Sequence, residues 1–138
     1  MHALAAGANV WAFEPDPRIF ADLEQNVNLN GFGARFHGSQ SALWWHSTLV
    51  SFDELEDVPT ITLDELKFAP DFIKIDVEGA ENKVIDGALE TLRKHKPKIL
   101  IEIHPEKGGD LRAIKKMLHF YEFQEGPVIG DTSFAFFE

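Results

Sequence analysis

Three acidic residues stand at or near the ends of short apolar runs, and their positions predict a shared binding site. Glu14 follows the run Val10–Phe13, Asp76 follows Phe72–Ile75, and Glu102 lies near the end of the most apolar run of the chain. Ligands of open α/β sheets bind beyond the carboxyl ends of the strands. If these runs are parallel strands, the three carboxylates meet around a hollow of nucleoside size.

Glu14 is a candidate for binding a ribose. An acid at the end of an early strand in an α/β unit commonly accepts hydrogen bonds from the two ribose hydroxyls, and a charged acceptor strengthens such bonds. The alternative is a solvated acid that stabilises the start of the following helix. Position alone leaves both interpretations open.

Asp76 and Glu78 flank Val77 immediately before Gly79, a residue that allows a sharp turn of the backbone. Two carboxylates this close disfavour each other's ionised form and could create a proton acceptor. The alternative is that one of them caps the next helix by accepting hydrogen bonds from its free N–H groups. The spacing does not decide between these roles.

Glu102 and His104 are two residues apart, so they point to the same side of an extended strand. A carboxylate beside an imidazole favours the protonated ring and fixes its orientation. Such a pair could act as a general base towards a hydroxyl group. The alternative is a buried acid bonded to the backbone, followed by a loop that begins at His104.

These residues depend on an alternation of strands and helices. Apolar runs predict strands, stretches with apolar residues every three or four positions predict helices, and Thr62 to Glu65 has the form of a capping box. Such alternation is typical of an α/β sheet with helices on both faces. The expected strands are 10–13, 34–37, 48–52, 72–75, 99–103, 120–123 and 133–137, and the expected helices begin near residues 17, 62, 80 and 111.

Composition narrows the class of protein. The 138 residues suit one domain, expected over residues 1–138, and the net charge of −10 argues against binding to nucleic acid or anionic membranes. The chain has no cysteine, and no apolar run approaches the roughly 20 residues that span a bilayer. The six histidines show no metal-ligand spacing, so no metal is expected. We expect a cytoplasmic protein; its oligomeric state is not predicted.

Several segments resemble the FkbM family of methyltransferases over about residues 8–105. The most specific segment, Asp71–Glu81, has the sequence DFIKIDVEGAE. Further segments are similar to family motifs at the expected places: Ala12–Pro17, Asn26–Gly31, Thr62–Leu66, Gly87–Ala88, Pro97 and Ile101–His104. The resemblance implies a Rossmann-like class I methyltransferase sheet.

The resemblance also implies a cofactor and a substrate class. Family members transfer a methyl group from S-adenosyl-L-methionine, typically to a hydroxyl of a sugar, polyketide or other small molecule. Glu14 would hold the ribose, the turn 38–42 would lie against the adenine, and Asp76 would border the methyl-transfer centre. The implied cofactor-binding residues are Glu14, Pro15, Ser39, Gln40, Asp76 and Glu78. The candidate catalytic residues are Asp76, Glu102 and His104, any of which could be the base.

One departure from the family leaves alternatives open. Family members begin with a strand that carries Asp-x-Gly-Ala-x-x-Gly, and this sequence has neither that first strand nor the glycine-rich loop. The strand would lie between Val10–Phe13 and Phe72–Ile75. One alternative is therefore a non-catalytic remnant that acts as a binding or scaffold module. A nicotinamide-dependent oxidoreductase also fits Glu14, although no Gly-x-Gly-x-x-Gly precedes it.

Overall fold

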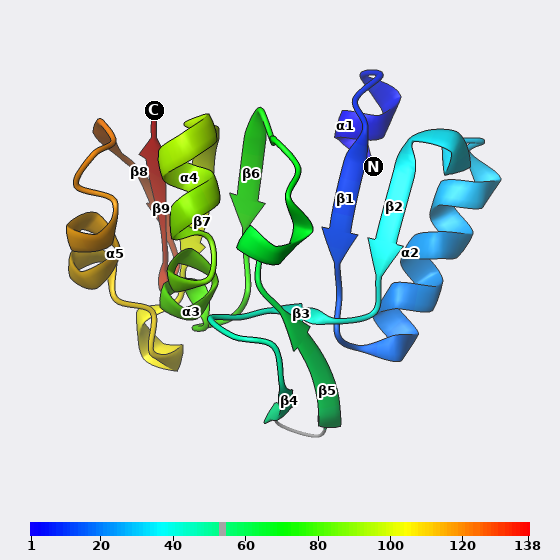
Figure 1. The fold of residues 1–138 in the computed structure, drawn as a ribbon, viewed down its shortest axis with the longest axis horizontal. Helices are drawn as coiled ribbons and strands as arrows, with labels where there is room; N and C mark the ends of the chain where they lie inside the picture. Colours follow the sequence, from blue (N-terminus) through cyan, green and yellow to red (C-terminus); the bar gives the residue numbers. More distant parts are fainter. Residues whose placement is uncertain (53–54) are drawn as a thin grey trace. The chain divides into compact units, whose positions relative to one another are not determined.

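The computed structural model describes residues 1–52 and 55–138, which fall into two compact units. The first unit contains residues 1–42 and 47–61, and the second contains residues 43–46 and 62–138. Each unit combines strands with helices (Figure 1), so the predicted α/β class is confirmed. Whether they form the single domain expected from the length stays a prediction.

The first unit is built on two parallel strands. Strand β1 (Val10–Phe13) pairs with β2 (Phe36–Ser39), and α2 (Pro17–Leu29) connects them. Asp16 caps α2 as expected, since its carboxylate accepts hydrogen bonds from the backbone N–H groups of Arg18 and Ile19. The remaining elements of this part are α1 (His2–Ala5), η1 (Gly33–Arg35), β4 (Leu49–Phe52) and β5 (Leu55–Ile61), of which β4 and β5 pair antiparallel. Strand β3 (Ala42–Leu43) follows β2.

The strand predicted at residues 34–37 is displaced. The structure places a turn of 3-10 helix at Gly33–Arg35 and the strand at Phe36–Ser39. Gly38 belongs to the strand because it pairs with Ala12 of β1. The rings of Phe36 and Phe20 lie close to it, since a Cβ there would be 2.7 Å from Phe36 and 3.0 Å from Phe20. The strand therefore ends at Ser39, beside the end of β1.

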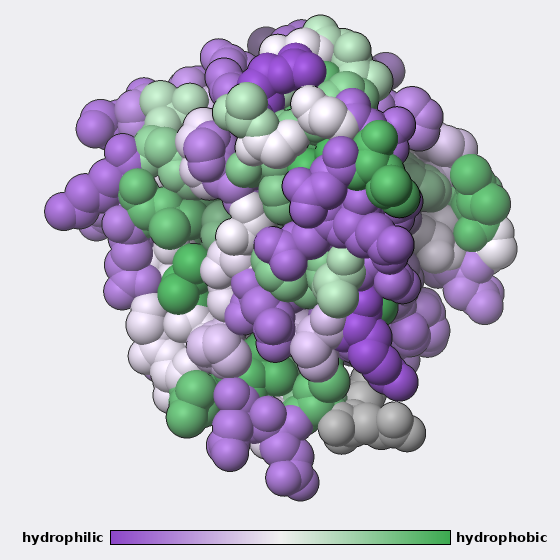
Figure 2. Space-filling model, turned by 90° about the vertical axis from the view of Figure 1, so that its right-hand side faces the viewer, coloured by the Kyte–Doolittle hydropathy of each residue, from purple (hydrophilic) through white to green (hydrophobic). Residues whose placement is uncertain are grey.

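Helix α2 leaves Ile19 and Leu29 exposed. On the face drawn in Figure 2, hydrophobic side chains are scattered among polar ones. Isolated apolar side chains of this kind are normal on a protein surface.

The second unit has a four-stranded sheet in the order β6-β7-β9-β8. Strand β7 (Lys98–Ile103) is internal, as predicted from its apolar sequence, and pairs parallel with β6 (Phe72–Ile75) and antiparallel with β9 (Thr132–Phe137). Strand β8 (Phe123–Ile129) pairs antiparallel with β9, so an antiparallel pair closes the chain as predicted. The strand predicted at 120–123 is wrong in its bounds, because it overlaps β8 only at Phe123.

Alternate residues of β7 form the centre of the core. Ile99, Ile101 and Ile103 are at most 1% exposed, and they pack with buried residues of α3 (Glu81–Asp86), α4 (Leu89–His95) and α5 (Leu111–Met117). The intervening residues Leu100 and Glu102 are only half-buried. The alternation of a strand therefore directs Glu102 away from this core.

The helix predicted from residue 80 is interrupted at Gly87–Ala88, which separates α3 from α4. A Cβ at Gly87 would lie 1.9 Å from the carbonyl oxygen of Trp44, so the backbone of Trp44 approaches this point closely. Asp64, in η2 (Asp64–Leu66), then caps α4 by accepting hydrogen bonds from the N–H groups of Glu90 and Thr91. The predicted capping box at Thr62 and Glu65 is confirmed by two reciprocal hydrogen bonds.

Candidate functional site

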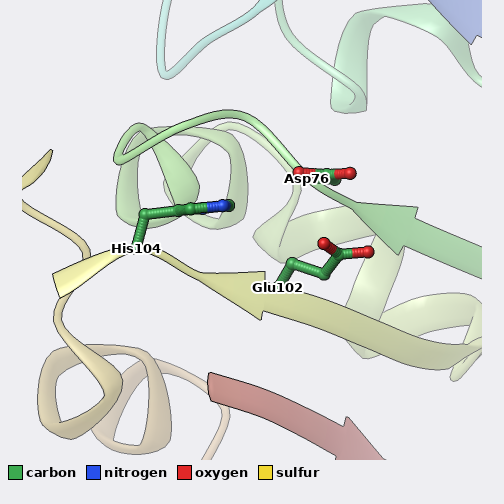
Figure 3. A group of neighbouring side chains, drawn as sticks. All are labelled: Asp76, Glu102 and His104. Atoms are coloured by element: carbon green, nitrogen blue, oxygen red, sulfur yellow. The ribbon is translucent and has the colours of Figure 1, made fainter. Parts of the chain in front are cut away.

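Parallel pairing of β6 and β7 brings three of the predicted site residues together. Ile75 lies opposite Ile101 in the register, so Asp76 and Glu102 follow at neighbouring strand ends. His104 is two residues beyond Glu102. One oxygen or nitrogen of each of the three side chains lies within 4.8 Å of the others (Figure 3). The three candidate catalytic residues therefore form one cluster.

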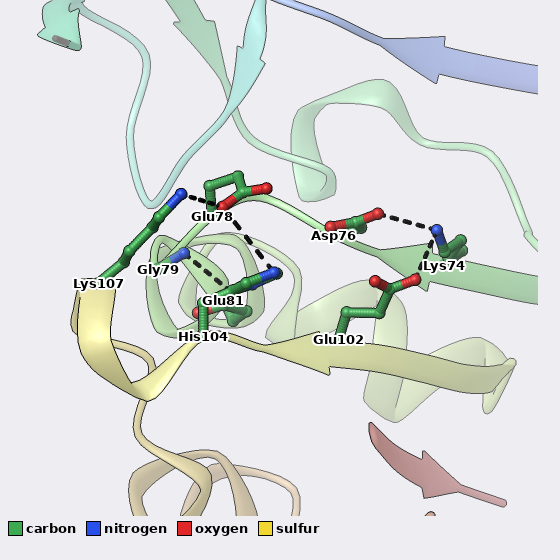
Figure 4. A network of polar contacts seen from close by, with 8 residues as sticks. All are labelled: Lys74, Asp76, Glu78, Gly79, Glu81, Glu102, His104 and Lys107. Carbon is green, nitrogen blue, oxygen red and sulfur yellow. Dashed lines mark hydrogen bonds and ion pairs between the residues drawn. The ribbon is translucent and has the colours of Figure 1, made fainter. Parts of the chain in front are cut away.

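A lysine bridges the two acids of this cluster. The Nζ of Lys74 lies 2.9 Å from Asp76 Oδ2 and 2.8 Å from Glu102 Oε1 (Figure 4). These contacts raise the pKa of Lys74, first through the hydrogen bond to Glu102 and also through that to Asp76, against the effect of partial burial. Lys74 is therefore held as a cation between both carboxylates.

His104 is paired with a buried carboxylate that the sequence analysis did not single out. The residue is 7% exposed, and its Nδ1 lies 3.1 Å from Oε1 of Glu81, which is 0% exposed. The same oxygen accepts a hydrogen bond from the N–H of Gly79 at 3.0 Å. Because a carboxylate only accepts, the pair assigns the proton of the neutral ring to Nδ1.

The spacing of the helix could have identified Glu81. It precedes Val84 and Ile85 by three and four positions, so it lies on the same face of α3 as these two core residues. An acid on the apolar face of a helix is rarely buried without a partner. The sequence did not show which residue that partner would be.

The turn between β6 and α3 has an unusual backbone. Glu78 has a φ of 53° and Gly79 a φ of 100°. A Cβ at Gly79 would lie 2.2 Å from the carbonyl oxygen of Lys107, so glycine is required by both conformation and space. Glu78 forms an ion pair with Lys107, which joins this turn to η3 (Pro105–Lys107). Such backbone outliers are frequent at functional sites.

The environment of His104 favours the charged ring. Burial, the largest influence, opposes protonation, but the hydrogen bond with Glu81 and the charges of Glu78, Glu81 and Asp76 outweigh it and raise the pKa of His104. The direction agrees with the prediction, although the carboxylates responsible do not include Glu102. The Nε2 atom of His104 lies 3.9 Å from Glu78 Oε2.

The cluster also has donors that suit a metal ion. Two carboxylates and an imidazole can hold a divalent cation. The ammonium group of Lys74 already contacts both carboxylates. We therefore assign no metal to these residues.

The remaining candidates lie in the first unit. Glu14 directly follows β1, and its Oε1 accepts a hydrogen bond from the N–H of Asp16 at 2.8 Å, as the helix-stabilising alternative predicts. Its Oε2 makes no hydrogen bond within residues 1–52 and 55–138. Ser39 pairs with Phe13 in the register, and Gln40 follows it. Glu14, Pro15, Ser39 and Gln40 therefore occupy the ends of two adjacent parallel strands.

In each unit, candidate residues follow the ends of parallel strands, and in the second unit a glycine turn then leads into a helix. This placement is typical of α/β proteins of the Rossmann class, which bind ligands beyond the strand ends. The model of the family described as "Methyltransferase FkbM domain" matches residues 1–125. The chain therefore belongs to the FkbM methyltransferase family, as its motifs predicted.

A solved structure supports this assignment. The chain is similar to the crystal structure of Methyltransferase FkbM from Methylobacillus flagellatus KT, with 25% sequence identity and a TM-score of 0.74. The match covers 93% of this chain and 36% of that one, so this chain spans about a third of the length of that methyltransferase. No curated protein matches the chain.

Proposed function

We propose that this chain carries the site of an S-adenosylmethionine-dependent methyltransferase that modifies a hydroxyl oxygen of a small molecule. Family membership supports methyl transfer. The observation that carries the choice of oxygen is the cluster of Asp76, Glu102 and His104, in which a histidine lies beside two carboxylates and its Nε2 has no hydrogen bond among the described residues. A hydroxyl substrate needs such a proton acceptor.

The charges of the cluster suit a cationic cofactor. Four carboxylates, those of Asp76, Glu78, Glu81 and Glu102, accompany the two ammonium groups of Lys74 and Lys107 (Figure 4). With all of them ionised and His104 neutral, two negative charges are uncompensated. The sulfonium and amino groups of S-adenosylmethionine outweigh its single carboxylate, so the cofactor is a net cation that such a field attracts.

In the other unit, Glu14 fits the ribose. Its Oε2 is available to accept hydrogen bonds from a diol while Oε1 keeps the contact with Asp16. Pro15, Ser39 and Gln40 lie at the same strand ends and complete the proposed cofactor-binding set with Glu14, Asp76 and Glu78.

The chemistry divides between cofactor and protein. When bound, S-adenosylmethionine would supply an electrophilic methyl group. The cofactor's sulfur would keep the electron pair of the C–S bond that breaks. The protein's part is to align the hydroxyl and to take its proton. His104 accepts that proton at Nε2, and the resulting imidazolium is stabilised by Glu81 and Glu78. Lys74 holds Asp76 and Glu102 in place.

Calorimetry with S-adenosylmethionine tests the cofactor assignment. We expect micromolar binding by the 138-residue chain and a loss of about tenfold or more in Glu14→Gln and in Asp76→Asn, because each change removes a charged acceptor. Glu125→Gln is the matched control, since Glu125 is exposed on β8 and its side chain makes no polar contact among the described residues. Radioactive methyl transfer to a panel of sugars and other hydroxyl compounds then tests the acceptor class.

The same experiments separate the alternatives. A folded chain that binds no S-adenosylmethionine would support the non-catalytic remnant, and displacement of bound cofactor by NAD would support an oxidoreductase. No helix in the described residues is long and apolar enough to cross a membrane. We further propose that the protein acts in the cytoplasm, a reducing compartment with which the absence of cysteine is compatible.

A further inference from the structure

Glu81 is a fully buried acid at the first position of a short helix. Burying a carboxylate is costly unless its oxygens find partners. Oε1 contacts both the N–H of Gly79 and Nδ1 of His104, whereas Oε2 has no hydrogen bond among the described residues. A neutral acceptor would be enough to bind the N–H of Gly79. The negative charge of Glu81 therefore matters for its other contact, the one with His104.

Two glycines enclose this pair. A Cβ at Gly109 would lie 2.7 Å from Glu81 Oε2 and about 3.0 Å from the backbone N of His104, and a Cβ at Gly79 would collide with Lys107. The carbonyl of His104 also accepts hydrogen bonds from the N–H groups of Lys107 and Gly109, each at 3.0 Å. Both the backbone and the ring of His104 are therefore fixed.

The pairing has a chemical consequence for the ring. A free histidine in its neutral form exists as two tautomers, and a hydrogen bond to one nitrogen decides which of them is present. With Nδ1–H donated to Glu81, the lone pair is at Nε2. This nitrogen faces the side on which Glu78, Asp76 and Glu102 lie (Figure 4).

We infer that Glu81 is a positioning residue, which holds neutral His104 in the Nδ1–H tautomer and thereby makes Nε2 the proton acceptor of the cluster. The inferred tautomer and orientation of the His104 ring depend only on the contacts of Glu81. Their catalytic meaning rests on the proposed methyl transfer.

Nitrogen-15 NMR of the labelled 138-residue chain tests the inference directly. Long-range proton–nitrogen spectra distinguish a protonated from a bare ring nitrogen, and His104→Gln identifies the signals of His104 among the six histidines. Above the titration midpoint of His104, we expect the Nδ1–H tautomer of the wild-type protein to outnumber the Nε2–H tautomer by about tenfold or more. A charge-assisted hydrogen bond to Glu81 provides a preference of this size. A ring with Nε2–H would overturn the inference.

Two isosteric variants separate positioning from a purely structural role. Glu81→Gln keeps an acceptor for Gly79 but removes the charge, so the tautomer ratio should fall about tenfold and the titration midpoint of His104 should fall with it. Glu78→Gln should lower the midpoint without lowering the ratio, because Glu78 lies beside Nε2 and not beside Nδ1. An unchanged ratio in folded Glu81→Gln would overturn the inference; if this variant does not fold, the wild-type tautomer decides.

Activity measurements keep the two proposals distinct. If methyl transfer is found, Glu81→Gln should lower kcat and shift its pH profile, with KM little changed. If no transfer or cofactor binding is found, the proposed function is wrong, while the NMR measurements still decide the role of Glu81.

Discussion

Replacing Gly109 by alanine should disturb the Glu81–His104 pair without altering any charged group. The added Cβ would lie 2.7 Å from Oε2 of Glu81 and 3.0–3.1 Å from the backbone N and O of His104. Gly109 does not have a positive φ, so alanine meets no conformational strain of its own. The effect therefore comes from the contacts alone.

The size of the effect follows from these distances. The carboxylate of Glu81 must move by about 0.7 Å, from 2.7 Å to the 3.4 Å of an ordinary contact, and Glu81 is fully buried. Added atoms in a well-packed interior typically cost about 1–3 kcal/mol. We expect a loss in this range, together with a weaker contact at Nδ1 and a lower titration midpoint of His104.

Urea denaturation and the NMR titration of His104 measure the two effects together. Gly33→Ala is the matched control, because Gly33 also lacks a positive φ and its Cβ would come no closer than 3.7 Å to another residue. The reasoning is refuted if Gly109→Ala is as stable as Gly33→Ala and His104 titrates as in the wild type.

Three further predictions concern the two units separately. The hydrogen bonds from the side chain and backbone of Arg18 lower the pKa of Asp16 to about 2. The contribution of Asp16 to the free energy of unfolding should therefore be present above pH 4 and be lost as the pH falls through about 2. Acid unfolding of Asp16→Asn should lack this pH-dependent loss. Tyr121→Phe should cost about 0.5–1.5 kcal/mol in urea denaturation, because the Tyr121 hydroxyl donates to the carbonyl of Leu92 at 3.2 Å. Ile101→Ala should cost about 2–5 kcal/mol and Ile129→Ala within about 0.5 kcal/mol, since these residues are 0% and 65% exposed.

The fold was largely predictable where the sequence has strong periodicity. The strand 72–75 and the capped helix that begins at Pro17 were found at their predicted places, because apolar runs and capping residues act locally. Strand β5 was not predicted, since its sequence LEDVPTI has weak alternation and a proline. The break at Gly87 was not predicted, and the close approach of the Trp44 backbone at this point could not be inferred because Trp44 is distant in the sequence.

The clustering of three candidate residues was predictable, but their hydrogen-bond and ion-pair partners were not. Asp76, Glu102 and His104 were identified from their strand-end positions, and parallel register brings them together. The partners were not predictable, because they depend on the turn geometry after each strand. His104 pairs with Glu81 rather than with Glu102, and Lys74 takes the position between the two strand-end acids.

Most of the charged side chains of the proposed site in the second unit come from residues 74–81. The turn within this segment determines which of them are exposed and which are buried. The extended backbone of β6 carries Lys74 and Asp76 on one side of the strand, where they form an ion pair. The left-handed conformations of Glu78 and Gly79 then reverse the chain, so Glu81 enters the interior beneath His104. A straight strand could not supply both an exposed carboxylate and a buried one to the same histidine. Glycine at position 79 is therefore as necessary to the site as the charged residues themselves.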